Sequence, residues 1–259
     1  MNKKSKKENG YNTVVPMPIQ LVQGWAKGQY QEIIKYHCYD LFKSFDESKQ
    51  SYNFDEYMCN HPFRYYMQSL NLGYEKLISD GESLYQKYNT KGAVFIYMPY
   101  RIINSLRYST KAKACLLYAM ALRSIVGSRK MIKTNNNEIW ARMCGYSSVR
   151  QHKTMAKMQN IEYEKDTGLL PLEFAIYNSR YHLNKFRDEL EQQDFSFNYW
   201  STNVRGMWVS FNPNMNKQVL ANIAFEKSQE SYNKIIEKKQ ANKETLARAR
   251  QHYIDTHKI

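Results

Sequence analysis

Apolar residues in the first third of the chain recur mostly at helical spacing. Between residues 19 and 88 many of them fall three or four positions apart, as at Tyr36, Tyr39 and Phe42. This pattern predicts a helical N-terminal region over 11–90, made of three or four helices. It is preceded at 1–10 by a basic segment that we expect to be a disordered tail, with weak attraction to phosphate as the alternative. Breaks between the helices are predicted near 46–53, at His61-Pro62, and at Gly73 or Gly81.

The pattern changes at 93–99, where AVFIYMP is continuously apolar and ends at a proline. Such a run predicts a buried strand or extended segment. The next segment, STKAKACLLYAMALRSIVG, is apolar nearly all round, which is typical of a helix buried on several sides. Ser109 or Thr110 can cap its start and Gly127 can end it.

The stretch TNNNEIWARMCGYSS, residues 134–148, has the signals of a helix, a tight turn and a second helix. Asn135 followed by Glu138 resembles a capping box, and Gly145 suits the left-handed residue that ends a helix. Ser147 or Ser148 can cap the next helix, SVRQHKTMAKMQN. That segment contains Arg, Lys and Gln but no carboxylate, so it is either a helix that contacts DNA or a solvated basic helix.

A second helix with suitable side chains lies at 179–194, where Leu183, Phe186 and Leu190 form a helical stripe. Alternating apolar residues on either side of a turn at 201–206 then predict a hairpin. After Pro213 the chain is predicted to form one long basic helix, over 213–259, whose later part has few apolar residues. We expect that later part to be solvated, with a partner or phosphate as alternatives.

The composition and charge of the chain favour a nucleic acid as its partner. The chain of 259 residues is 42% hydrophobic, which is enough for a substantial core, and carries a formal charge of +14. Residues 91–159 contain 13 Lys and Arg and a single acid, Glu138. This segment therefore holds a net charge of +12, which predicts a binding module for phosphate flanked by less charged scaffold.

The order of strand, buried helix STKAKACLLYAMALRS, turn TNNNEIWARMCGYSS and hairpin YWSTNVRGMWVSF resembles the winged-helix domains of plasmid and phage replication initiators and related regulators. The resemblance covers about 93–211 and implies that one helix reads the major groove of duplex DNA while the hairpin contacts the backbone. The segment after Gly145 is longer than an ordinary turn. Helices 147–159 and 179–194 therefore stay open as alternatives for the reading helix.

Signatures of other function classes are missing from the sequence. The four cysteines are scattered, the six histidines form no His-x-His pair, and there is no phosphate-binding glycine loop. We therefore expect no metal, no cofactor and no catalytic residue, and a binding protein instead of an enzyme. The scattered cysteines indicate a reducing cytoplasm, and the sequence lacks an apolar segment of membrane-spanning length, so we expect a cytoplasmic protein without membrane contact.

The sequence thus predicts a mainly α fold with a small β-hairpin, in which a winged helix-turn-helix core at 91–212 lies between the N-terminal helices and the C-terminal helix. We expect it to bind double-stranded DNA as a replication initiator or transcription regulator of a phage, plasmid or other mobile element. A non-specific nucleic-acid-binding structural or packaging protein of a phage is the alternative, and both a monomer and a homodimer stay open. The expected DNA-binding residues are Lys133, Arg142, Ser147, Arg150, Gln151, Lys153, Lys157, Arg180, Asn184, Lys185 and Arg205.

Overall fold

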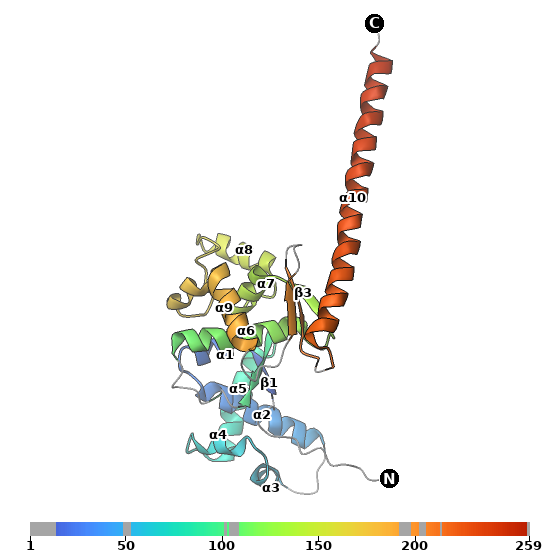
Figure 1. The fold of residues 1–259 in the computed structure, drawn as a ribbon. Coiled ribbons are helices and arrows are strands. Elements are labelled where there is room, and N and C mark those ends of the chain that lie inside the picture. Colours follow the sequence, from blue (N-terminus) through green and yellow to red (C-terminus); the bar gives the residue numbers. More distant parts are fainter. Residues whose placement is uncertain are drawn as a thin grey trace, which may run out of the picture. The chain divides into compact units, whose positions relative to one another are not determined.

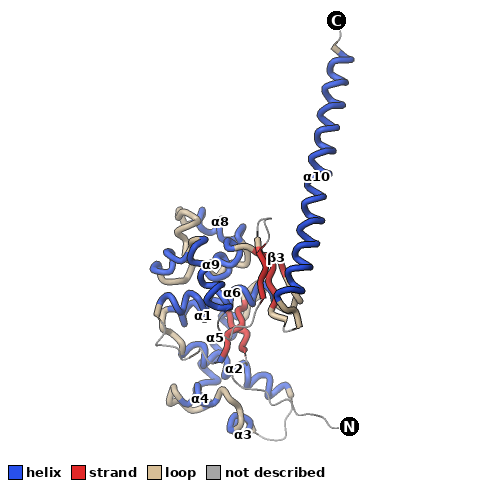
Figure 2. The backbone as a smooth tube through the Cα atoms, viewed as in Figure 1, coloured by secondary structure: helices blue, strands red, loops and turns tan. Residues whose placement is uncertain are grey.

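The computed structural model is mainly helical and contains two small antiparallel sheets (Figures 1 and 2). This confirms the predicted mainly α fold with a small β component. The structure describes residues 14–48, 53–100, 103, 109–191, 198–201, 206–212 and 214–257. The chain forms two compact units, one of residues 1–128 with 136–196 and one of 129–135 with 197–259. These units divide the chain at different places from the expected boundaries at 91 and 213.

The described residues of the N-terminal part of the first unit form five helices instead of the predicted three or four. The break predicted at Gly73 or Gly81 is at Gly73, which precedes the last of them, whereas Gly81 lies inside that helix. A side chain at Gly81 would collide with the backbone oxygen of Lys35, so glycine is needed there for close helix packing. The helices are α1 (Ile19–Ala26), α2 (Gln31–Glu47), α3 (Phe54–Cys59), α4 (Arg64–Gln68) and α5 (Tyr74–Tyr88).

The predicted strand at 93–99 is present as β2 (Phe95–Pro99). Its partner is an element that the helical reading of the N-terminal region missed, β1 (Val14–Pro18). The two strands pair antiparallel, with Pro16 opposite Tyr97. The short length of β1 and its two prolines explain the omission, because proline is usually a signal against a strand.

The centre of the first unit is α6 (Thr110–Val126), which is buried over most of its length. Ser109 caps its start by accepting a hydrogen bond from the amide of Ala112, and Gly127 follows its end with a positive φ. Both predictions are confirmed. The unit continues with α7 (Asn136–Met143), α8 (Val149–Met158), the 3₁₀-helix η3 (Leu172–Tyr177) and α9 (Arg180–Glu191).

The second unit combines a three-stranded sheet with a long helix. Its strands are β3 (Ile132–Thr134), β4 (Asn198–Ser201) and β5 (Met207–Ser210), with β5 in the middle and antiparallel to both neighbours. The predicted hairpin is therefore present as β4 and β5. The predicted C-terminal helix is also present, as α10 (Lys217–Thr256), and its first turns pack on β4 and β5 (Figure 1).

Candidate nucleic-acid interface

The turn between α7 and α8 is closed by backbone hydrogen bonds. Gly145 has a φ of 93°, a conformation that strains residues with a Cβ, and its amide donates to the oxygen of Arg142. The amide of Tyr146 donates to the oxygen of Ala141 at 2.9 Å. This pair of bonds is the Schellman arrangement, which satisfies the free carbonyl groups at the end of a helix. The predicted helix, glycine turn and second helix are thus confirmed.

An N-terminal residue also holds this turn. Gln23, on α1, is almost fully buried and donates from its side-chain amide to the backbone oxygen of Met143 at 3.2 Å. The same amide lies where a side chain at Gly145 would have to be placed. Through Gln23, α1 therefore helps to fix the end of α7, a role that no local signal in the sequence predicts.

Two of the expected DNA-binding residues cap α8. Ser148 accepts a hydrogen bond from the amide of Gln151, and the side-chain oxygen of Gln151 accepts from both the amide and the hydroxyl of Ser147. This reciprocal pattern is a variant of the capping box. A nearby arginine, Arg142, donates to the backbone oxygen of Ser147 at 3.3 Å, and partial burial lowers the pKa of its guanidinium. Arg142, Ser147 and Gln151 thus already have structural partners in the turn.

The remaining residues of α8 divide into two faces. His152 and Ala156 are buried, whereas Arg150, Lys153 and Lys157 are exposed at positions that share the opposite face of the helix. The Lys153 ammonium lies 5.2 Å from the ring centre of Tyr163, a cation–π contact. No carboxylate belongs to α8 itself. The exposed face of α8 thus presents three cations.

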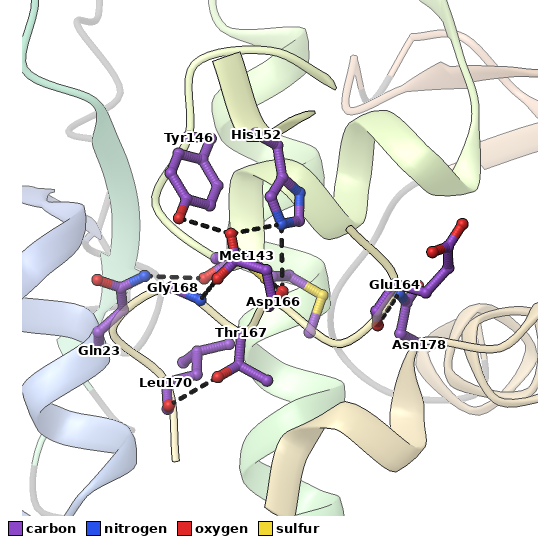
Figure 3. A network of polar contacts seen from close by, with 11 residues as sticks. Gln23, Met143, Tyr146, His152, Glu164, Asp166, Thr167, Gly168, Leu170 and Asn178 are labelled. Atoms are coloured by element: carbon purple, nitrogen blue, oxygen red, sulfur yellow. Dashed lines mark hydrogen bonds and ion pairs between the residues drawn. The ribbon is translucent and has the colours of Figure 1, made fainter. Parts of the chain in front are cut away.

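A polar network around Asp166 contacts the buried face of α8 through His152 (Figure 3). The carboxylate is buried and accepts hydrogen bonds from the hydroxyl of Tyr146 and from the amide of Gly168, both at 2.8 Å. The bond to Gly168 is an Asx-turn, which folds the segment after α8 back toward it. Nε2 of His152 lies 3.1 Å from the backbone oxygen of Asp166 and 3.2 Å from the carboxylate. Asp166 therefore joins the turn, α8 and the segment that follows.

The geometry of this network favours a neutral histidine. Both atoms near Nε2 of His152 are acceptors, so Nε2 carries the proton of the neutral ring. Among the described residues, the buried Nδ1 has no hydrogen-bond partner. A second proton there would be an unsatisfied buried donor. Burial accordingly lowers the pKa of His152, although Asp166 opposes the shift.

The second candidate helix, α9, presents a more balanced set of charges. Leu183, Phe186 and Leu190 are buried, which confirms the predicted stripe. Arg180 and Lys185 are exposed, and Asn184 accepts a hydrogen bond from the side chain of Asn136. The exposed acid Asp188 pairs with its neighbour Arg187, and Glu189 pairs with Lys111 of α6 at 2.9 Å.

The two other expected DNA-binding residues belong to the second unit. Lys133 lies on β3 opposite Trp208 of β5, and it is partly exposed. A side chain at Gly206, at the end of the hairpin turn, would contact the side chain of Lys133. Arg205 lies outside the described residues.

Other kinds of site were sought in the part of the chain that the structure describes. No cluster of three His, Cys, Asp or Glu side chains there could hold a metal ion. No helix in the same part combines the length and apolar character needed to cross a bilayer.

Comparison with protein-family models, with curated proteins and with solved structures finds no match to this chain.

Proposed function

We propose that this protein binds double-stranded DNA through a winged-helix domain and regulates replication or transcription of a phage, plasmid or other mobile element. The observation that carries the proposal is the exposed face of α8, where Arg150, Lys153 and Lys157 lie together at the end of a helix-turn-helix. Cations arranged in this way neutralise phosphates and release counterions, which supplies much of the affinity of DNA-binding proteins.

The order of elements supports the same proposal. Along the chain, α6, β3 and α7 are followed, after the segment that contains α8, by α9 and the hairpin β4–β5. The last strand lies between the other two in the sheet. A helix, strand, helix, helix and hairpin in this order is the sequence of elements in a winged helix. The role as initiator or regulator rests on the resemblance alone.

The test is a titration with duplex DNA at several salt concentrations. The logarithm of the binding constant falls linearly with the logarithm of the salt concentration. If the three cations of α8 each contact a phosphate, replacing all three with glutamine makes this negative slope shallower by about 3. Over a fourfold change in salt, three contacts correspond to about 40-fold in affinity. The matched control is Arg180→Gln with Lys185→Gln on α9.

Each outcome of this titration bears on the proposal. If the α9 control loses affinity for duplex DNA while the α8 variant keeps it, the phosphate contacts belong to α9 instead of α8. A chain that prefers one DNA sequence by several kcal/mol is a specific regulator, whereas a salt slope without preference indicates the packaging alternative. Failure of the unmodified protein to bind duplex DNA at low salt would overturn the proposal.

A further inference from the structure

Among the described residues of its own unit, none packs against the far part of α10. Its buried residues are Leu220, Ala221, Ala224 and Ser228, all in the first 12 positions of a 40-residue helix. Every residue from 229 to 257 is exposed. At 1.5 Å per residue, the segment from Tyr232 to Tyr253 extends for about 33 Å, and Figure 1 shows it continuing beyond the sheet.

An apolar seam with a seven-residue repeat runs along this exposed part. The first position of the repeat, a, is occupied by Tyr232, Lys239, Leu246 and Tyr253, and position d by Ile235, Asn242 and Ala249. Tyr232, Leu246 and Tyr253 are each more than half exposed. A repeat of seven keeps one seam facing a partner helix as two helices wind around each other. The polar pair Lys239 and Asn242 is the kind of interruption that fixes register in such a pair.

Charges beside the seam are arranged by face. The positions that border it, e and g, contain Lys238, Lys243 and Arg250 but no acid. In the described chain, these three side chains form no ion pair with a carboxylate. The acids from 225 to 256 all lie on the opposite face, at positions b, c and f: Glu226, Glu230, Glu237, Glu244 and Asp255.

This distribution disfavours a second copy of the chain as the partner. In a parallel pair of identical helices, position g of one chain faces e of the next heptad on the other, so Lys238 would face Lys243. In an antiparallel pair, positions e and g meet their own kind, and these hold only neutral or basic residues. Like charges at these positions oppose pairing.

We propose that residues 232–253 of α10 form a docking surface for an amphipathic helix of another protein that carries acids beside its own apolar seam. The apolar residues at a and d supply the buried contact, and the basic e and g positions select an acidic partner over a basic one. This surface shares no residue with α8 or α9, and the proposal does not depend on the proposed DNA site.

The test uses the full-length protein and two labelled 28-residue helical peptides. Both carry Leu at a and d, with one Asn at a central a position; one has Glu and the other Lys at every e and g. Exchanging attraction for repulsion at one exposed pair changes a dissociation constant by about threefold. The three basic positions together predict that the Glu peptide binds about 30-fold more tightly, as measured by fluorescence anisotropy.

Substitutions in the chain identify the surface. Ile235→Asp, at position d, is expected to abolish binding of the Glu peptide. Asn233→Asp adds the same charge at the outer position b and is expected to leave binding within about threefold, the size of one exposed charge pair. Circular dichroism checks that both variants keep α10 helical. If Ile235→Asp proves to disrupt the helix, Lys243→Glu takes its place as the test variant. It leaves the residues at a and d unchanged and is expected to weaken binding of the Glu peptide.

Three results would overturn the proposal. The first is equal binding of the two peptides, and the second is no binding of either. The third is self-association of the chain in sedimentation that Ile235→Asp abolishes, because this would assign the seam to a second copy. DNA affinity is measured separately on the same variants, so failure here is distinguishable from failure of the proposed function.

Discussion

Replacing Asp166 with alanine tests whether the buried network positions α8. The substitution removes the acceptor for the hydroxyl of Tyr146 and for the amide of Gly168. It keeps the backbone oxygen that faces His152. A hydrogen bond to a charged group contributes about 1.5–3 kcal/mol, and a donor left unsatisfied in the interior adds to the loss. Because removal of a buried carboxylate also relieves its desolvation, we expect a net loss of about 3 kcal/mol in the free energy of unfolding.

Urea unfolding followed by circular dichroism measures this loss. Tyr146→Phe is the matched control, since it removes one of the two bonds and keeps the carboxylate; we expect it to cost about 1.5 kcal/mol. The double variant should cost less than the sum, because both changes remove the same bond. A loss below about 1 kcal/mol for Asp166→Ala would refute the reasoning, because it would show that the two donors find other acceptors.

The same variant separates positioning from charge in DNA binding. Asp166→Ala raises the formal charge of the chain, which is +14, by one unit. If affinity depends on overall charge alone, the variant binds duplex DNA more tightly. If α8 must be held by the network, the variant binds more weakly at a temperature where it remains folded. Tighter binding would therefore refute the assignment of Asp166 as a positioning residue.

Three further predictions concern stability. The unfolded pKa of a histidine is about 6.5, and burial lowers the pKa of His152 in the folded state, so the unfolded chain binds more protons below that pH. His152 should therefore lower the free energy of unfolding by up to about 1.4 kcal/mol per pH unit as the pH drops below 6.5, in addition to the contributions of His37 and His61, whose pKa values burial also lowers. His152→Gln should reduce the total slope in urea titrations across pH. Gly81→Ala should destabilise by about 1–3 kcal/mol in urea unfolding because of the collision with Lys35, although alanine favours helices by about 1 kcal/mol; a more stable variant would contradict the packing argument. Gln23→Leu should cost about 1–3 kcal/mol by leaving the oxygen of Met143 unsatisfied, with faster hydrogen exchange at the α7–α8 turn as the specific signature.

Local signals made the central elements predictable. Ser109 and Gly127 bound α6, and Gly145 ends α7, because caps and left-handed residues depend on a few neighbouring atoms. The stripe on α9 was equally local. The choice between Gly73 and Gly81 as the break was not local, since the need for glycine at position 81 comes from α2, which lies more than 30 residues away in the sequence. Pairing of β1 with β2 is also a long-range property, which period and composition do not reveal.

The sequence predicted that the candidate site is a positively charged segment, but not which of its residues are structural and which are free to bind DNA. Arg142, Ser147 and Gln151 have side chains suited to DNA, and only their contacts show that they close and cap the turn. Asp166 had a local signal in the Asp-Thr-Gly order of an Asx-turn, but its contact with His152 required the fold. Gln23 had no signal, because its partner lies 120 residues away.

The contacts of these residues show which side chains of the two candidate reading helices, α8 and α9, are available to bind DNA. On α8, His152 packs one face of the helix against Asp166, and the polar side chains at the N-terminus form the cap. The cations that are exposed to a ligand are therefore Arg150, Lys153 and Lys157. On α9, acids share the helix with Arg180 and Lys185. Phosphate affinity depends on cations without adjacent acids, whereas base reading depends on which helix enters the groove. Salt slope should therefore follow α8 whichever helix reads bases, and sequence preference is the measurement that assigns the reading helix.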